Sequence, residues 1–243
     1  MTKEKIGRHA SNVIVTTKNR DSFLLSRYDD GYPVKKMFRG WANLTGGANS
    51  KKDSIYISPE ELLRREVGEE YSTSQAMYEK DMIHLEESSP TGTVKPNRAF
   101  ASREDIESIR GSILENLVPY CDFIVRIPGE NFRQGKNKEQ YKNIFSVFES
   151  VIPEEAMALA KRNLDSGKGL VNEGLVHLAT TNELRDGFPF LAWATSPILS
   201  HYTDLNFPNL INATEVEIGM PRGSFESYFE DFSYEPGFFK DEK

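Results

Sequence analysis

The first part of the chain places apolar and β-branched residues in short runs, a pattern typical of β-strands. Residues 11–17 are rich in β-branched side chains, and residues 23–28 follow after a polar turn, so we expect the two runs to pair as a hairpin. A third strand is predicted at 38–44, ending at Thr45-Gly46-Gly47. Further along the chain, the same kind of pattern predicts strands at 120–128, 141–152 and 170–178.

Apolar residues at helical spacing predict helices between these strands. The clearest helix covers 58–71, where Ser58 suits the N-cap and Pro59 suits the first helical position. Glu61 lies three residues after Ser58 and completes the sequence signature of a capping box. Pro197 could bend or divide the last helix of the chain. The other predicted helices cover 102–118, 153–164 and 190–202.

Strands and helices are mixed without a regular βαβ alternation, which favours the α+β class. The 243 residues suffice for one domain, and we expect a single domain over 1–243. Its core is expected at about 10–72 and 119–202, with 73–118 mostly an insertion that is partly helical. The C-terminal tail at 221–243 is aromatic and acidic, and it either packs against the body, which we favour, or contacts a partner.

Composition narrows the class of protein. Apolar residues make up 38% and charged residues 28%, as in ordinary soluble proteins, and no run of about 18 apolar residues predicts a membrane span. The polar N-terminus lacks the apolar segment of a signal peptide, and the single cysteine, Cys121, excludes an internal disulfide. We therefore expect a cytoplasmic protein.

The formal net charge is −7, and the basic residues are dispersed. General nucleic-acid binders are usually basic with clustered Lys and Arg, so this class is not expected. An acidic protein that binds an anionic substrate needs local positive charge, and a divalent cation can supply it.

The predicted helix at 58–71 carries the candidate chemistry. Because each helical residue advances by about 100°, Glu66, Glu69 and Glu70 fall on one face. Carboxylates this close repel each other, and a cation such as Mg²⁺ or Mn²⁺, which prefers oxygen ligands, would relieve the repulsion. Arg65 can brace one of these carboxylates or a nearby loop. The alternative is a solvated charged face. An apolar stripe beside the carboxylates consists of Leu63, Val67 and Tyr71.

This segment resembles the Nudix box, whose core reads Arg-Glu-apolar-x-Glu-Glu-x-Gly-apolar. Residues 65–70 read Arg-Glu-Val-Gly-Glu-Glu, and residues 44–47 read Leu-Thr-Gly-Gly where Nudix proteins have Leu-Pro-Gly-Gly. Residues 58–61, 24–27 and 173–184 also fit the family. The resemblance spans about 10–202 apart from the insertion. It implies the Nudix fold, a mixed β-sheet sandwiched between helices.

Four features depart from the family pattern: the length of one spacer and the residues at three positions. The spacer after Gly47 is longer than usual, and Ile57 stands where the family has a glutamate before the helix. Ser72 replaces the glycine that ends the motif helix, and Thr45 replaces proline. The three glutamates of the motif are intact, so we expect an active enzyme.

The resemblance implies a metal-dependent hydrolase that cleaves a diphosphate linkage in a nucleoside diphosphate derivative. Its metal ligands would be Glu66, Glu69 and Glu70, with Mg²⁺ or Mn²⁺ as the cofactor. Either Glu69 or Glu70 could also act as the base. A later glutamate often has this role in the family, and Glu173 is the first candidate, with Glu155 the second.

The substrate is expected to be a small nucleotide, with a dinucleotide, an ADP-ribose-like compound or a nucleotide sugar favoured over a triphosphate. Arg27 could contact phosphate, and the backbone at Gly46 and Gly47 would approach the metal. We expect His177 to be structural. A homodimer is compatible with this picture. Three aromatic residues could stack on a base, although core packing is favoured for each of them: Tyr32, Phe38 and Trp41.

Two other hypotheses remain open. The chain could be a Nudix-fold sensor or scaffold that binds a nucleotide and hydrolyses it weakly or not at all, which the altered spacer and Ser72 would favour. It could also be an unrelated globular protein in which the motif arises by chance.

Overall fold

The computed structural model describes residues 6–27, 41–48, 57–72, 99–127, 141–171, 175–189, 191–192, 194–208 and 215–220. Its strands are β1 (Ile6–Thr16), β2 (Ser22–Arg27), β3 (Ala42–Asn43), β4 (Thr45–Ala48), β5 (Leu117–Ile127), β6 (Tyr141–Val151), β7 (Leu175–Thr180) and β8 (Glu215–Met220). Its helices are α1 (Pro59–Glu70), α3 (Arg103–Glu115), α4 (Glu154–Asp165), α5 (Thr181–Arg185) and α6 (Thr195–Thr203).

The eight strands form one mixed sheet in the order β3-β2-β1-β6-β5-β8, with β4 paired to β1 and β7 paired to β2. Strands β1 and β6 run parallel, and the other pairs are antiparallel. One edge of β1 is shared, because its last two residues pair with β2 and the stretch before them pairs with β4. The segment 42–48 therefore passes from the edge of β2 to the edge of β1.

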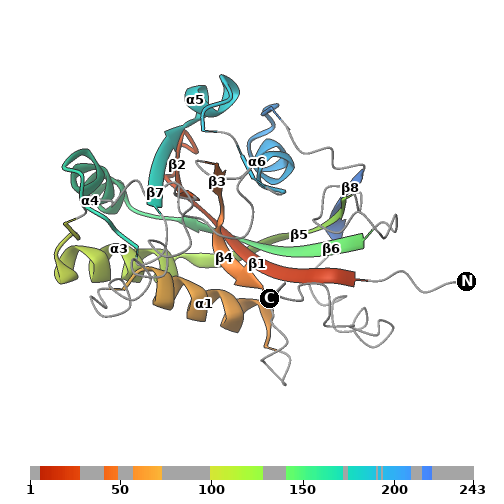
Figure 1. Cartoon of the computed structure of the whole chain (residues 1–243), viewed down its shortest axis with the longest axis horizontal. Coiled ribbons are helices and arrows are strands. Elements are labelled where there is room, and N and C mark those ends of the chain that lie inside the picture. Colours follow the sequence, from red (N-terminus) through yellow and green to blue (C-terminus); the bar gives the residue numbers. More distant parts are fainter. Residues whose placement is uncertain are drawn as a thin grey trace, which may run out of the picture.

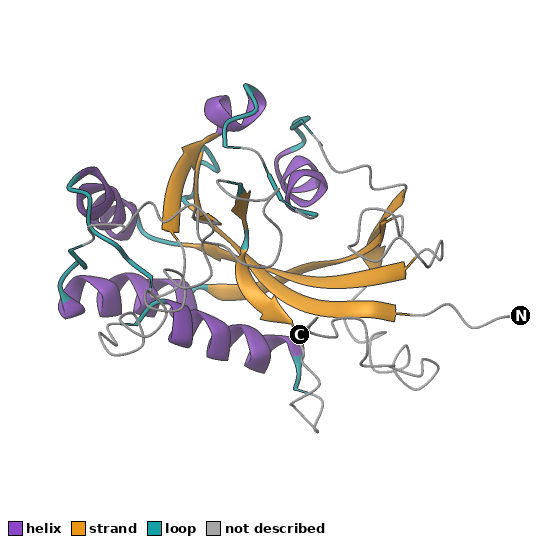
Figure 2. Cartoon of the chain, in the orientation of Figure 1, coloured by secondary structure: helices purple, strands orange, loops and turns teal. Residues whose placement is uncertain are grey.

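Helices cover both faces of the sheet (Figures 1 and 2). Buried residues of α1, α3 and α4 form one core against one face, and buried residues of α5 and α6 form a second core against the other. The expected α+β class, with a mixed sheet sandwiched between helices, is confirmed. Among the described helices, none is long and apolar enough to cross a membrane.

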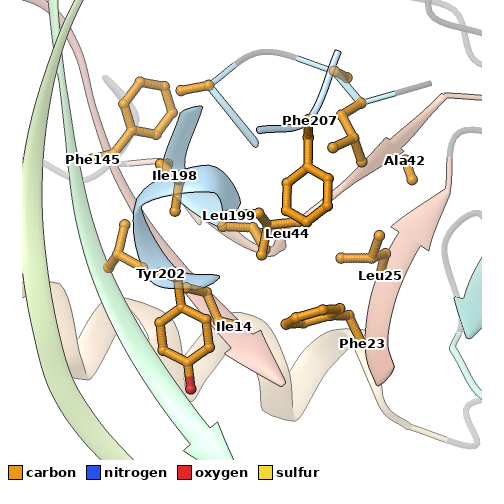
Figure 3. Packing of buried hydrophobic residues seen from close by; sticks show 14 of the residues in the cluster. Ile14, Phe23, Leu25, Ala42, Leu44, Phe145, Ile198, Leu199, Tyr202 and Phe207 are labelled. Atoms are coloured by element: carbon orange, nitrogen blue, oxygen red, sulfur yellow. The ribbon is translucent and has the colours of Figure 1, made fainter. Parts of the chain in front are cut away.

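The stretch 9–16 of β1 is buried on both faces because it lies between the two cores. Val13 and Val15 belong to the core with α1 and α3, whereas Ile14 belongs to the core with α6. Figure 3 shows Ile14 and Phe23 of the strands in the same cluster as Tyr202 of α6. Burial on both faces explains why the apolar residues at 13–15 are consecutive rather than alternating with polar ones.

The structure confirms the predicted hairpin and the helices predicted at 58–71 and 153–164. It also confirms the strands predicted at 120–128 and 141–152, which are β5 and β6. The third strand was predicted over 38–44, but within the described residues it is only β3, at Ala42–Asn43. A separate strand, β4, follows and runs through Gly46 and Gly47 to Ala48. The strand predicted at 170–178 is β7, which begins later, at Leu175. Neither helix α5 nor strand β8 was predicted from the sequence.

The last predicted helix also needs correction, because α6 begins at Thr195 rather than at 190. Pro197 lies in its first turn, where a backbone N–H has no partner within the helix. Proline is tolerated there, so Pro197 neither bends nor divides the helix.

Helix α3 confirms the helix predicted at 102–118 except at its end, because the helix stops at Glu115 and β5 begins at Leu117. The Ser102 side chain accepts a hydrogen bond from the Asp105 N–H at the start of the helix. Its isoleucines at 106, 109 and 113 are fully buried in the core shared with α1 and α4. This part of the expected insertion therefore contributes to the main core. Residues 73–98 and the tail at 221–243 lie outside the described residues, and the domain boundaries stay a prediction.

Gly111 in α3 offers a test of this packing. A methyl group built at this position would meet no heavy atom within 4 Å. Since glycine in a helix costs about 0.5–1 kcal/mol relative to alanine, Gly111→Ala should raise the free energy of unfolding by that amount in urea titrations. The exposed Ala158 of α4 provides the matched control, because Ala158→Gly should lower it similarly. A destabilised Gly111→Ala protein would show that α3 packs differently.

Candidate functional site

Helix α1 is held in place by its N-cap and its apolar stripe. The Ser58 Oγ accepts a hydrogen bond from the Glu61 N–H at 3.3 Å, and Pro59 occupies the first turn. The predicted stripe is confirmed, since Leu63, Val67 and Tyr71 are all fully buried. Burial of this stripe fixes the rotation of the helix, so the carboxylate face is directed along the neighbouring strand β4.

Glu66 lies directly on the backbone of Gly47. A methyl group built on Gly47 would be 2.2 Å from the Glu66 Cδ and 2.5 Å from its Oε2, closer than any real contact. Only glycine therefore allows the carboxylate to lie against the strand. The Arg65 Nη2 donates a hydrogen bond to the Glu66 Oε1 at 3.2 Å, which is the bracing role predicted for Arg65.

Glu70 is one helical turn further and contacts the hydroxyl group of Ser26 in the sheet, which in turn contacts that of Thr45. The Ser26 Oγ donates to the Glu70 Oε2 at 3.4 Å, and it lies 2.9 Å from the Thr45 Oγ1. Burial and then the negative charge of Glu70 raise the pKa of the adjacent Tyr71 phenol above its usual range, with the Thr45 hydroxyl opposing that rise. The phenol is therefore protonated at neutral pH.

Glu69 is directed away from this pair. Its side chain is 63% exposed, and its Oε1 lies 3.9 Å from the Arg65 Nε. The helix thus brings Glu66 and Glu70 to the strand but leaves Glu69 at the solvent side. Within the described residues, no three Asp, Glu, His or Cys side chains are grouped as a complete metal site.

The arrangement nevertheless fits a hard divalent cation. Glu66 and Glu70 are neighbours on one helix face, and both offer oxygen ligands beside a strand where Gly47 leaves room. Mg²⁺ commonly uses only one or two carboxylates and completes its shell with water and substrate phosphates. Two carboxylates that face the same strand satisfy that requirement.

Gly46 has a different role from Gly47. Its φ of +150° lies in a region that residues with a side chain rarely adopt, and an added methyl group would lie 2.0 Å from the carbonyl oxygen of Ser11. The strand β4 can pair with β1 here only because position 46 lacks a side chain. Glycine at 46 therefore shapes the strand, and glycine at 47 makes room for the carboxylate.

Arg27 is not brought to the carboxylates. It is the last residue of β2, and because Leu25 lies in the α6-side core, alternation directs Arg27 to that same face. Its guanidinium carbon lies 6.0 Å from the ring centroid of Phe188, and the His177 ring packs edge-on against that ring at 5.8 Å. The half-buried His177 thus has the packing contact expected of a structural residue.

The remaining predicted residues fall into two groups. Glu173, Tyr32 and Phe38 lie outside the described residues. Trp41 is partly buried against the α6-side core, and Glu155 is exposed in the first turn of α4, far in sequence from the motif helix. Ser26 was not predicted to belong to the site. Thr45 was noted only as a departure from the family pattern, and that departure was the one feature of the sequence that could have indicated its contact with Ser26.

The departure at Ser72 has a simple structural reason. Helix α1 ends at Glu70, and its C-cap, Tyr71, has a φ of −84°. Ser72, the residue after the cap, is not among the described non-glycine residues with a positive φ, so glycine is not needed there. Serine at 72 is therefore compatible with an unaltered motif helix.

Comparisons with known proteins give structural likeness only. No protein-family model matches the sequence, and no curated protein matches it. The fold is similar to that of a Nudix hydrolase from M. smegmatis, RenU, at 10% sequence identity and a TM-score of 0.37, covering 83% of this chain and 86% of that one. It is also similar to a Nudix hydrolase from Alicyclobacillus acidocaldarius, at 13% identity and a TM-score of 0.36, covering 85% and 99% of the two chains. These TM-scores are low, so the chemistry of this chain is inferred from its own residues.

The two adjacent glycines give a paired prediction. Gly46→Ala should lower the free energy of unfolding by about 1–3 kcal/mol or more, because it forces a strained backbone and a backbone collision. Gly47→Ala should largely keep the fold, because the colliding group is the end of the flexible Glu66 side chain, but it should displace that carboxylate and weaken Mn²⁺ binding. Denaturant titration and Mn²⁺ titration followed by electron paramagnetic resonance measure the two effects. Equal behaviour of both variants would contradict these separate roles.

Proposed function

We propose that this chain is a metal-dependent hydrolase of the Nudix type that cleaves a diphosphate linkage in a nucleoside diphosphate derivative. The observation that supports it most is the seating of Glu66 on Gly47, with Glu70 beside it, on the helix that carries the Arg-Glu-x-x-Glu-Glu motif. A buried apolar stripe holds this helix, so the carboxylates are presented by a rigid element rather than by a loop.

In this proposal, Glu66 and Glu70 hold a Mg²⁺ or Mn²⁺ ion, and Glu69, the third carboxylate of the motif, lies on the solvent side of the helix. When bound, the ion neutralises phosphate charge and lowers the pKa of a water molecule. Arg65 restrains the Glu66 carboxylate through its hydrogen bond at 3.2 Å.

Proton transfer to or from water needs a carboxylate that water can reach. The Glu69 side chain is 63% exposed, against 23% for that of Glu66. Glu70 already accepts a hydrogen bond from Ser26. These contacts favour Glu69 over Glu70 as the base, with Glu173 retained as the alternative from outside the motif.

Charge bears on the class of substrate. A protein with a net charge of −7 needs the cation to attract a diphosphate. Arg27 lies beside Phe188, a residue that is 54% exposed, but on the face of β2 opposite to the one from which Ser26 reaches Glu70. This pair therefore supports no choice of base or sugar at the carboxylate site. A dinucleotide, an ADP-ribose-like compound or a nucleotide sugar stays the substrate class favoured from the sequence.

A second candidate is a nucleotide sensor that binds without hydrolysis. The outward direction of Glu69 favours it, because only two of the three motif carboxylates face the strand. Turnover separates the two candidates, since a sensor binds a nucleotide without releasing a phosphate-containing product.

The test is hydrolysis of a panel of ADP-ribose, dinucleoside polyphosphates, nucleotide sugars and nucleoside triphosphates with Mg²⁺ or Mn²⁺. Glu66→Gln and Glu70→Gln should each lower the rate more than ~100-fold, because loss of a metal ligand exceeds the effect of an outer-shell change. Glu61→Gln removes an exposed carboxylate from the same helix and should leave the rate within about 2-fold.

Two results would count against the proposal. Tight binding of one nucleotide without any turnover would establish the sensor instead. Normal rates in both Glu66→Gln and Glu70→Gln would show that the hydrolytic site lies elsewhere.

A further inference from the structure

Thr45 is a fully buried threonine at the position where the resembled motif has proline. Proline has no side-chain hydroxyl, so it could not make the contact seen here. The Thr45 Oγ1 lies 2.9 Å from the Ser26 Oγ, and the Ser26 Oγ in turn donates to Glu70 at 3.4 Å. The departure from the family pattern is therefore directly connected to a motif carboxylate.

The protons in this chain of hydroxyls run in one direction. A serine hydroxyl has one proton, and a carboxylate can only accept. Because Ser26 gives its proton to Glu70, the proton between the two hydroxyls must come from Thr45. Hydrogen bonds aligned in this way polarise one another, which strengthens the bond that reaches the carboxylate.

Both hydroxyls are attached to paired strands. Ser26 lies opposite Asn43 on one side and Val176 on the other, and Thr45 lies opposite Val13 of β1. Their backbones are thus fixed by the sheet rather than by a loop. Glu70, in contrast, has a flexible side chain that must be restrained to act in a defined geometry.

The strand and the helix also match in spacing. Gly47 contacts Glu66, and Thr45 is linked to Glu70, so two alternate strand positions meet two helix positions one turn apart. Alternate strand residues are about 6.8 Å apart, and four helical residues rise about 6 Å. Strand β4 can therefore serve both carboxylates at once.

We propose that Thr45 and Ser26 form a hydroxyl relay that positions the Glu70 carboxylate for the divalent cation. They are positioning residues, since they act through Glu70 and not on the substrate. The inference rests on the proposed function. It gives a role to the threonine that stands where the resembled motif has proline, which is to orient a motif glutamate. Outer-shell partners of this kind commonly change metal affinity by 10–100-fold.

The test is Mn²⁺ affinity in the absence of substrate, measured by electron paramagnetic resonance of the free ion. Thr45→Val and Ser26→Ala should each raise the Kd for Mn²⁺ about 10–100-fold. Thr45→Ser keeps a hydroxyl and should restore the Kd to within about 3-fold of wild type, a recovery that a purely structural role for the threonine methyl group would not give.

Thr16→Val is the matched control. Thr16 is also a fully buried threonine, and its Oγ1 donates to the carbonyl oxygen of Ser22 at 2.7 Å, at the other end of β2. Its loss removes a buried hydroxyl contact without touching Glu70, so the Kd for Mn²⁺ should not change. If Thr45→Val fails to fold by circular dichroism, the half-buried Ser26→Ala variant decides the matter.

The outcomes separate this inference from the proposed function. Wild-type Kd values in Ser26→Ala and in folded Thr45→Val, with Glu70→Gln still impaired, would overturn the relay and leave the hydrolase proposal intact. Failure of the wild-type protein to bind Mn²⁺, or unchanged binding in Glu70→Gln, would overturn the metal site and the relay with it.

Discussion

The site depends on the close packing of α1 against strand β4. Where the two elements meet, the Glu66 side chain occupies the space that a side chain at position 47 would need. A single missing methyl group thus decides whether a charged carboxylate can lie against the backbone of the sheet. Van der Waals contact, rather than an attractive bond, limits how closely the Glu66 carboxylate approaches the backbone of Gly47. The hydrogen bond from Arg65 then restrains that carboxylate.

Several other features of the fold stabilise the contact between Glu66 and Gly47. The buried stripe of α1 fixes the rotation of the helix, so Glu66 and Glu70 share the strand side and Glu69 does not. The unusual backbone of Gly46 lets β4 continue along β1 and carry position 47 to the helix. Strand β1, buried on both faces, ties this region to the two cores. The carboxylates are therefore held by elements on which the fold itself depends.

Much of this could be predicted from local patterns. Ser58 and the apolar stripe predicted both the start and the buried face of α1, because capping and helical periodicity are local properties. The direction of each carboxylate could not be predicted, since it depends on what lies opposite. The sequence also placed Gly46 and Gly47 at the end of a strand, because glycine usually marks a turn, yet the pairing with β1 continues through both. The contact of Thr45 with Ser26 joins residues 19 positions apart, and no periodicity reports it.

Crystals grown or soaked with Mn²⁺ and measured for anomalous scattering would test the central claim most directly, because the signal locates the ion without assuming any ligand. The account predicts a peak between the carboxylates of Glu66 and Glu70, on the side of α1 that faces Gly47. A peak elsewhere on the protein, or no peak at a concentration that supports hydrolysis, would contradict it.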